Sequence, residues 1–170
     1  MNLFGLRFFI MLAIGFFSIF SFGGELMKPT GPIILTMTGN IQFTNSPDDK
    51  AEFDLSMIES MGLKKRVTTT PWTDGVTVFE GVFIKDLLDV VGAAGKDLKI
   101  TALNDYSANM PIEDLEKYKV LLALKQNGKM LRIRDKGPLF VVYPFDEFPE
   151  LQNEIIHNRS VWQVKSIRIE

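Results

Sequence analysis

The clearest pattern of hydrophobic and polar residues runs from Val67 to Gly92 and changes its period once. Its first part alternates between apolar and polar residues and is rich in threonine and valine, which predicts extended chain. The turn signal Asp74-Gly75 divides this part in two. We therefore expect a strand, a turn and a second, short strand.

The second part of the same stretch has the period of a helix. Four apolar residues recur at the spacing i, i+3, i+4 and i+7, namely Ile84, Leu87, Leu88 and Val91. This spacing places them on one helix face, which we expect to pack on a sheet. Gly92 supplies the left-handed residue that ends such a helix. The loops that join these elements are the natural place for a binding site.

The remaining patterns predict many short strands and a few short helices. Asp54 is placed to cap a helix that runs through Met61 and stops at Gly62, and Pro111 is placed to start another in its first turn. Asn127-Gly128 is the strongest hairpin signal in the chain. The other expected strands are 33–41, 64–72, 98–103, 120–126, 129–134, 139–143 and 161–169, and a polar, helical excursion is expected at 146–158. Together they predict an α+β domain with a mixed sheet or partial barrel.

One strand, Leu139 to Tyr143, is apolar without interruption, as expected for a strand that is covered on both faces. We expect it to lie centrally.

The N-terminal residues 1–23 differ from all that follow. Arg7 precedes an apolar run that ends in small residues, which is typical of a secretory signal peptide. We expect cleavage and a periplasmic or secreted protein, with 24–52 as an N-terminal strand and loop and 53–170 as the main domain. The alternative is a membrane anchor formed by residues 3–22, because this stretch approaches the length that spans a bilayer. A lipoprotein anchor is excluded because the chain has no cysteine.

Composition narrows the classes of function. The formal net charge is −2 and there are no long basic runs, which argues against nucleic acid as a partner. Without cysteine, an exported domain must hold its core without disulfides. His157 is the only histidine, so a histidine-based metal site or catalytic triad has little support, and we expect His157 at the surface.

Two further groups of residues have plain structural interpretations. The acidic cluster Glu113, Asp114 and Glu116 is expected to be a solvated helix face. Trp72 and Trp162 are expected to be core residues rather than stacking platforms.

A series of short motifs resembles, in order and spacing, the sulfite-oxidase-like, molybdopterin-dependent oxidoreductase domain. The resemblance covers roughly residues 53–170 and rests on Trp72, Gly75, Phe79-Glu80-Gly81-Val82, Asp86-Leu87-Leu88, Gly92, Asp105-Tyr106, Leu121-Leu122-Ala123, Asn127-Gly128, Gly137-Pro138-Leu139, Tyr143-Pro144 and Trp162. It implies the sulfite-oxidase-like molybdopterin-binding fold.

The same resemblance implies two departures from the chemistry of the family. Its molybdenum is held by the pterin dithiolene and by a cysteine thiolate on the strand before the tryptophan, a place that falls on Thr68. After Gly137-Pro138-Leu139 many members carry an arginine, whereas this chain has Phe140. We therefore lean against an enzyme and expect no cofactor and no catalytic or metal-ligating residue.

By the resemblance, loops around the former cofactor pocket bring together the candidate pocket residues Arg66, Thr68, Thr69, Trp72, Asp105 and Tyr106. Such a cleft could bind a small molecule or a periplasmic or membrane protein, as a sensory module would. Two alternatives stay open. The pocket could be filled, which leaves a structural interaction module, or the chain could be an active molybdopterin oxidoreductase with a non-cysteine metal environment. The oligomeric state is not predicted.

Overall fold

The computed structural model describes residues 26–170, so the expected signal peptide lies outside the described residues and its cleavage stays a prediction. Within 26–170, none of the helices is long and apolar enough to cross a membrane. The helices are short: α1 (Leu55–Ser60), α2 (Ile84–Val90), α3 (Ile112–Tyr118) and α4 (Glu154–Arg159), with 3₁₀ turns η1 (Ile133–Asp135) and η2 (Pro149–Leu151).

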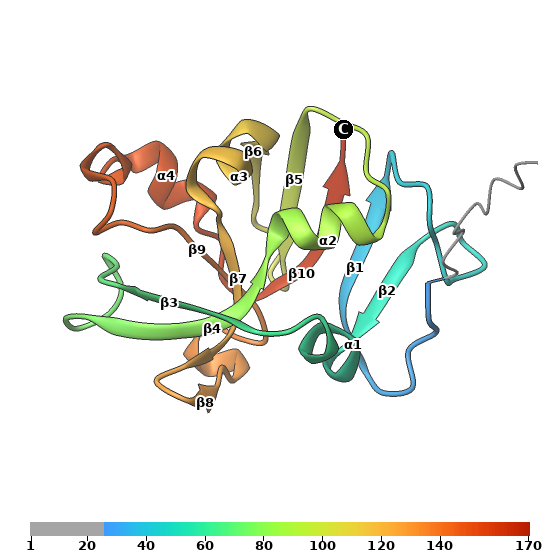
Figure 1. The fold of residues 1–170 in the computed structure, drawn as a ribbon, viewed down its shortest axis with the longest axis horizontal. Helices are drawn as coiled ribbons and strands as arrows, with labels where there is room; N and C mark the ends of the chain where they lie inside the picture. The colour runs from blue at the N-terminus through green and yellow to red at the C-terminus, as the bar shows by residue number, and fades with distance from the viewer. Residues whose placement is uncertain (1–25) are drawn as a thin grey trace, which may run out of the picture.

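The strands form two sheets (Figure 1). Sheet A has the order β2 (Ala51–Asp54), β1 (Ile33–Gly39), β10 (Val164–Ile169), β5 (Asp97–Ala102) and β6 (Ser107–Pro111). In it, β1 and β10 run parallel and all other neighbours antiparallel. Sheet B is antiparallel, with the order β3 (Lys64–Thr68), β4 (Thr77–Phe83), β7 (Leu121–Gln126) and β8 (Lys129–Met130), while β9 (Phe140–Val142) also pairs with β7. The predicted α+β class with mixed pairing is confirmed.

The main hydrophobic core draws on both sheets and on the buried faces of the helices. A second, smaller cluster, to which Phe79 belongs, lies on the other face of sheet B. Strand β9 serves both, because Val141 belongs to the main core while Phe140 and Val142 belong to the second cluster. The uninterrupted apolar run therefore marks a strand with two covered faces, as predicted. Its expected central place was wrong, because within residues 26–170 β7 is the one strand of sheet B with which β9 pairs, and beyond that β9 has only an isolated bridge to Trp162.

The helix predicted from the 3.6-residue period is confirmed as α2. All four residues of its apolar face are buried in the main core. Gly92, with φ of +60°, follows the helix end in the left-handed conformation. In α1, the carboxylate of Asp54 accepts a hydrogen bond from the Met57 N–H at 2.9 Å, which confirms the predicted cap.

Several predicted boundaries were wrong. The strand expected at 64–72 ends at Thr68, because the hydroxyl of Thr70 accepts from the Trp72 N–H and the chain turns there. The strand expected at 129–134 is only two residues long before η1 begins. The excursion at 146–158 is split into η2 and α4. Pro111 ends β6 and lies just before α3 rather than in its first turn, and neither β2 nor β6 was predicted.

Candidate functional site

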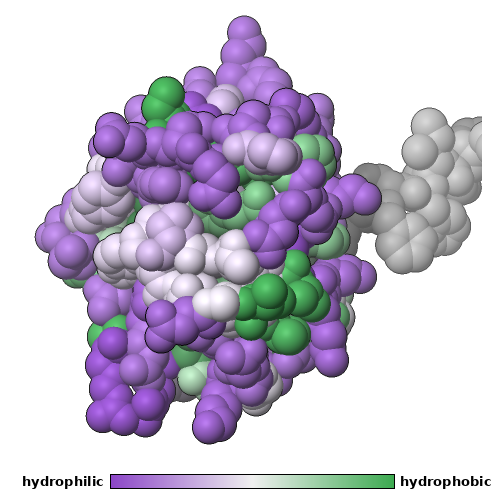
Figure 2. All heavy atoms as spheres, turned by 90° about the vertical axis from the view of Figure 1, so that its left-hand side faces the viewer, coloured by the Kyte–Doolittle hydropathy of each residue, from purple (hydrophilic) through white to green (hydrophobic). Residues whose placement is uncertain are grey.

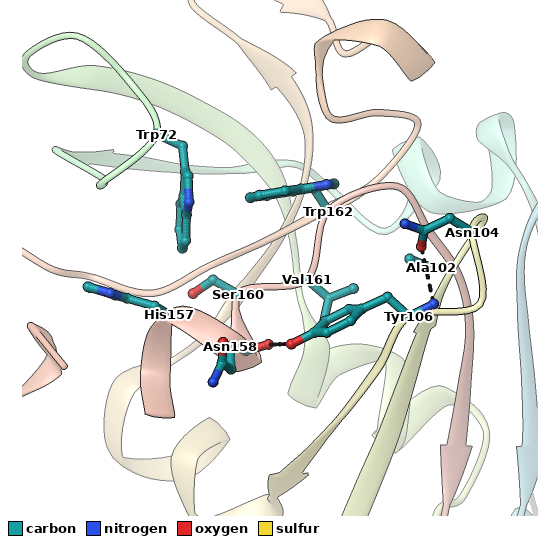
Figure 3. Close-up of a pocket in the computed structure, with 9 residues that line it drawn as sticks. All are labelled: Trp72, Ala102, Asn104, Tyr106, His157, Asn158, Ser160, Val161 and Trp162. Carbon is teal, nitrogen blue, oxygen red and sulfur yellow. Dashed lines mark hydrogen bonds between the residues drawn. The ribbon is translucent and has the colours of Figure 1, made fainter. Parts of the chain in front are cut away.

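A hollow of about 410 Å³ opens where the loop after β3, the β5–β6 turn and α4 meet (Figure 3). These segments are far apart in sequence and are brought together by the pairing of β5 with β10 and by the bridge between Phe140 and Trp162. The hollow is lined by Trp72, Ala102, Asn104, Tyr106, His157, Asn158, Ser160, Val161 and Trp162. A volume of this size suits a small organic ligand.

Aromatic rings form the walls of the hollow. The centroids of the Trp72 and Trp162 rings are 5.4 Å apart and their planes cross at 81°. The ring of His157 lies 5.7 Å from Trp72, again nearly perpendicular to it. Figure 3 shows Trp72 and His157 at one end of the hollow, while Tyr106 reaches in from the opposite end. Perpendicular contacts of this kind are favourable and hold each ring in a fixed orientation.

The polar groups of the hollow are few, and most of them form hydrogen bonds within the protein. Tyr106 donates its hydroxyl hydrogen bond to the Asn158 carbonyl at 3.1 Å, and its N–H donates to the Asn104 side-chain oxygen at 3.1 Å (Figure 3). The Ser160 hydroxyl donates to the Ile156 carbonyl at 2.9 Å. In contrast, Nε2 of His157 is buried and has no hydrogen-bond partner within residues 26–170. A buried imidazole nitrogen without a partner is uncommon in folded proteins.

Helix α4, which supplies His157, is fixed at both ends. The Asn153 side chain caps its start by accepting from the Ile156 N–H at 3.1 Å. At its end, Arg159 pairs with Asp114 of α3 at 2.9 Å, and the Tyr143 hydroxyl donates to the same carboxylate at 2.7 Å. Burial raises the pKa of the Tyr143 phenol, so the phenol stays protonated and keeps donating.

The expectation of a solvated acidic cluster on α3 was therefore wrong for one residue. Glu113 and Glu116 are exposed, whereas Asp114 is half-buried in the contact with Tyr143 and Arg159.

Two of the candidate residues, Thr68 and Thr69, form hydrogen bonds with the segment that follows β9 and do not line the hollow. Thr68 is completely buried, and its hydroxyl accepts from the Asp146 N–H at 3.2 Å and donates to the Thr69 carbonyl at 3.1 Å. The N–H of Thr69 donates to the Asp146 carboxylate at 2.7 Å. The hydroxyl of Thr68, the N–H of Thr69 and the two groups of Asp146 therefore satisfy one another's hydrogen bonds.

Arg66 and Asp105 also point to other partners. Arg66 is buried, pairs with Glu147 at 2.7 Å and donates to the Lys119 carbonyl at 2.7 Å. The Asp105 carboxylate is exposed and pairs with Lys165, and its hydrogen bond to that ammonium lowers its pKa. Of the six candidate residues, only Trp72 and Tyr106 line the hollow.

The expected plain roles of His157 and Trp162 were incomplete. His157 is not a free surface residue, because it packs between Trp72 and Phe145 with centroid distances of 5.7 and 5.8 Å. Trp162 is 38% exposed and lines the hollow, so it is not a core residue. The signal that could have found both is their rarity, since the chain has one histidine and two tryptophans and all three meet here.

The face that carries the end of the β3–β4 hairpin and α4 is seen in Figure 2. A pale zone of nearly neutral hydropathy and a hydrophobic patch beside it interrupt the hydrophilic surface. Exposed Val67 and Val76 lie on this hairpin and exposed Ile155 on α4.

Within residues 26–170, no group of three or more histidine, cysteine, aspartate or glutamate residues is arranged to hold a metal ion.

Comparison with protein families places the chain. The model of the oxidoreductase molybdopterin binding domain matches residues 50–146, which is more than half of the sequence. The chain therefore belongs to this family. No match was found among curated proteins.

A solved structure of similar fold is the crystal structure of the sulfane dehydrogenase SoxCD from Paracoccus pantotrophus. The TM-score is 0.59 at 19% sequence identity, and the match covers 79% of this chain and 37% of that chain. The chain thus spans well under half of the length of that protein. The likeness shows the fold, in agreement with the predicted sulfite-oxidase-like architecture.

Proposed function

We propose that this member of the oxidoreductase molybdopterin binding domain family acts by binding a small ligand in the aromatic hollow and carries out no molybdenum redox chemistry. The observation that carries the proposal is the aromatic-walled hollow, whose lining includes His157 with a buried, unpartnered Nε2. Two departures at the positions of the family chemistry support it.

The first departure is at Thr68, the place that the resemblance gives to the metal-binding cysteine. A hydroxyl stays protonated near neutral pH and offers no anionic sulfur, the kind of ligand that members of this family provide to molybdenum. In addition, the Thr68 hydroxyl already accepts from the Asp146 N–H and donates to the Thr69 carbonyl. The residues at this position therefore do not fit a thiolate-bound molybdenum.

The second departure is at Phe140, the place of the family arginine. Its ring is completely buried and packs against Trp72 at 6.1 Å and Phe79 at 5.9 Å. An apolar ring in this contact supplies no positive charge to a neighbouring site. The Phe140 ring instead supports Trp72 by packing against it.

The ligand that suits the hollow is small, uncharged and aromatic. No lysine, arginine, aspartate or glutamate is among the lining residues, so nothing there neutralises a full charge. The rings of Trp72, Trp162 and Tyr106 offer faces and edges to a planar group. A hydrogen-bonding group on the ligand ring would supply the partner that the buried Nε2 of His157 lacks.

Intrinsic fluorescence tests this proposal directly, because both tryptophans of the chain line the hollow. We would titrate the protein with small uncharged aromatic compounds that carry one hydrogen-bonding group, such as indazole and benzamide, and with charged analogues such as benzoate. The neutral probes are expected to change the emission in a saturable way and to raise the melting temperature. If no neutral probe does so, or if benzoate binds equally well, the proposed ligand site is wrong.

Family membership supports one rival, an active molybdopterin oxidoreductase with a non-cysteine metal environment. Metal and pterin analysis decides between the two. Protein made in a host with active molybdopterin synthesis is expected to contain no stoichiometric molybdenum. Near-stoichiometric metal together with turnover of sulfite or a sulfoxide would establish the rival.

A further inference from the structure

We propose that the loop formed by β8 and η1, which we call the basic loop (residues 129–136), docks onto a membrane surface rich in anionic phospholipid. The proposal is independent of the aromatic hollow, with which the basic loop shares no residue. In Figure 1, β8 projects at the bottom of the molecule, away from the core of sheet B.

The charge of the basic loop is opposite to that of the whole chain. The chain carries a formal net charge of −2, whereas this loop has four cations and one acid: Lys129, Arg132, Arg134, Lys136 and Asp135. Asp135 accepts from Arg132 at 2.6 Å and lies 3.9 Å from Arg134. Lys129 and Lys136 form no ion pair within residues 26–170, so most of the positive charge is available to a partner.

Large apolar side chains stand among these cations. Met130 is 41% exposed and Ile133 is 60% exposed. Ile133 also borders a shallow apolar depression with Ile33 and Leu103, which are themselves exposed. Exposed apolar side chains set between arginine and lysine are the arrangement by which peripheral proteins enter the interface of a bilayer.

The basic loop is held in a fixed shape, so it loses little freedom on docking. Leu131 is buried and its N–H donates to the Leu124 carbonyl at 2.8 Å. The N–H of Gly137 donates to the Arg132 carbonyl at 2.8 Å, and the Gln163 amide donates to the Ile133 carbonyl at 2.7 Å. These bonds turn Leu131 inward and leave Met130 and Ile133 outside.

A membrane would bind both the cations and the exposed apolar side chains of the basic loop. Anionic headgroups attract lysine and arginine within about 10 Å of the bilayer, and each cation strengthens binding about fivefold. A nucleic acid or another soluble polyanion would use the cations but has no use for Ile133 between them. The apolar residues therefore favour lipid.

The test uses the full chain and exploits its lack of cysteine. Met130→Cys, labelled with an environment-sensitive fluorophore, reports insertion of the basic loop. Glu116→Cys on α3, which lies toward the opposite edge of the molecule in Figure 1, is the matched reporter for general adsorption. Vesicles of phosphatidylcholine alone are compared with vesicles in which about one third is phosphatidylglycerol.

The Met130 reporter is expected to shift to the blue only with the anionic vesicles, and the Glu116 reporter is not. Replacing Lys129, Arg132 and Arg134 by Gln should weaken binding about a hundredfold, whereas Gln at Lys64, Lys65 and Lys85 should change it less than about twofold. Ile133→Ser should reduce the blue shift. Equal shifts with both vesicles and both reporters, or heparin binding as tight as lipid and insensitive to Ile133→Ser, would overturn the proposal.

Discussion

The side-chain hydroxyl of Thr68 accepts a hydrogen bond from the backbone N–H of Asp146 at 3.2 Å, across 78 residues of sequence. This bond ties the end of β3 to the segment that follows β9. Thr68 is fully buried, so this bond satisfies a hydroxyl that water cannot reach. The position that would carry the family's metal ligand thus has a structural role in this chain.

Thr68→Val tests this role, because valine keeps the volume and removes the acceptor. The Asp146 N–H is then left without its partner, and we expect the free energy of unfolding to fall by about 1–3 kcal/mol. The reverse exchange at the exposed neighbour, Val67→Thr, should change it by less than about 0.5 kcal/mol. Urea unfolding measures both, and equal effects would show that the Thr68 bond contributes nothing.

Thr68→Cys tests the chemistry of the same position. The side chains are similar in size, so the variant should fold and lose no more than about 1.5 kcal/mol. It should still contain no stoichiometric molybdenum and show no sulfite turnover, because Phe140 remains at the place of the cationic residue. Restoration of metal and turnover by this single change would mean that only the ligand had been lost.

The fold was largely predictable because its main signals are local. The period of α2, the cap at Asp54 and the apolar run of β9 each depend on a few neighbouring residues. The strands that were not predicted, β2 and β6, are edge strands of four and five residues. Their pairing is decided by distant partners rather than by their own pattern.

The candidate site was less predictable for the same reason. Arg66 and Asp105 have polar side chains in suitable segments, but their partners, Glu147 and Lys165, come from parts of the chain that no short motif relates to them. His157 was assigned to the surface because its sequence neighbours are polar. Only the fold shows that Trp72 and Phe145 pack against it.

Leu87→Ala measures what the α2 face contributes. Leu87 is completely buried in the main core, and its truncation should cost about 2–5 kcal/mol. Val90→Ala, on the exposed side of the same helix, is the control and should cost less than about 1 kcal/mol. Denaturant unfolding checks both, and a loss below about 0.5 kcal/mol at Leu87 would contradict the assigned packing.

Asp54 should make stability depend on acid pH. Hydrogen bonds to its carboxylate, the largest from the Met57 N–H and others from Ser56 and Gly31, hold its pKa well below the usual value. The unfolded chain therefore binds this proton first, so the stabilisation is present above the unfolded pKa of about 3.9 and is lost as the pH falls further.

Asp54→Asn should consequently lower stability at neutral pH and flatten its fall below about pH 4. The urea midpoint as a function of pH measures this. Asp49→Asn, at an exposed loop position, is the control and should leave the profile of the parent protein unchanged. An Asp54→Asn profile that runs parallel to that of the parent would contradict the assigned role.

His157→Phe should separate stability from ligand binding, because the structure gives the imidazole Nε2 no partner within residues 26–170. Phenylalanine fits among the rings of Trp72 and Phe145 and removes the unpaired nitrogen, so the free protein should become more stable by about 1 kcal/mol. The neutral aromatic probes should then bind about fivefold more weakly, because their hydrogen bond to Nε2 is lost. Thermal unfolding and fluorescence titration measure the two effects. A residue with a merely structural role would move both in the same direction, so a variant that loses stability along with binding would show that His157 supports the hollow without contacting the ligand.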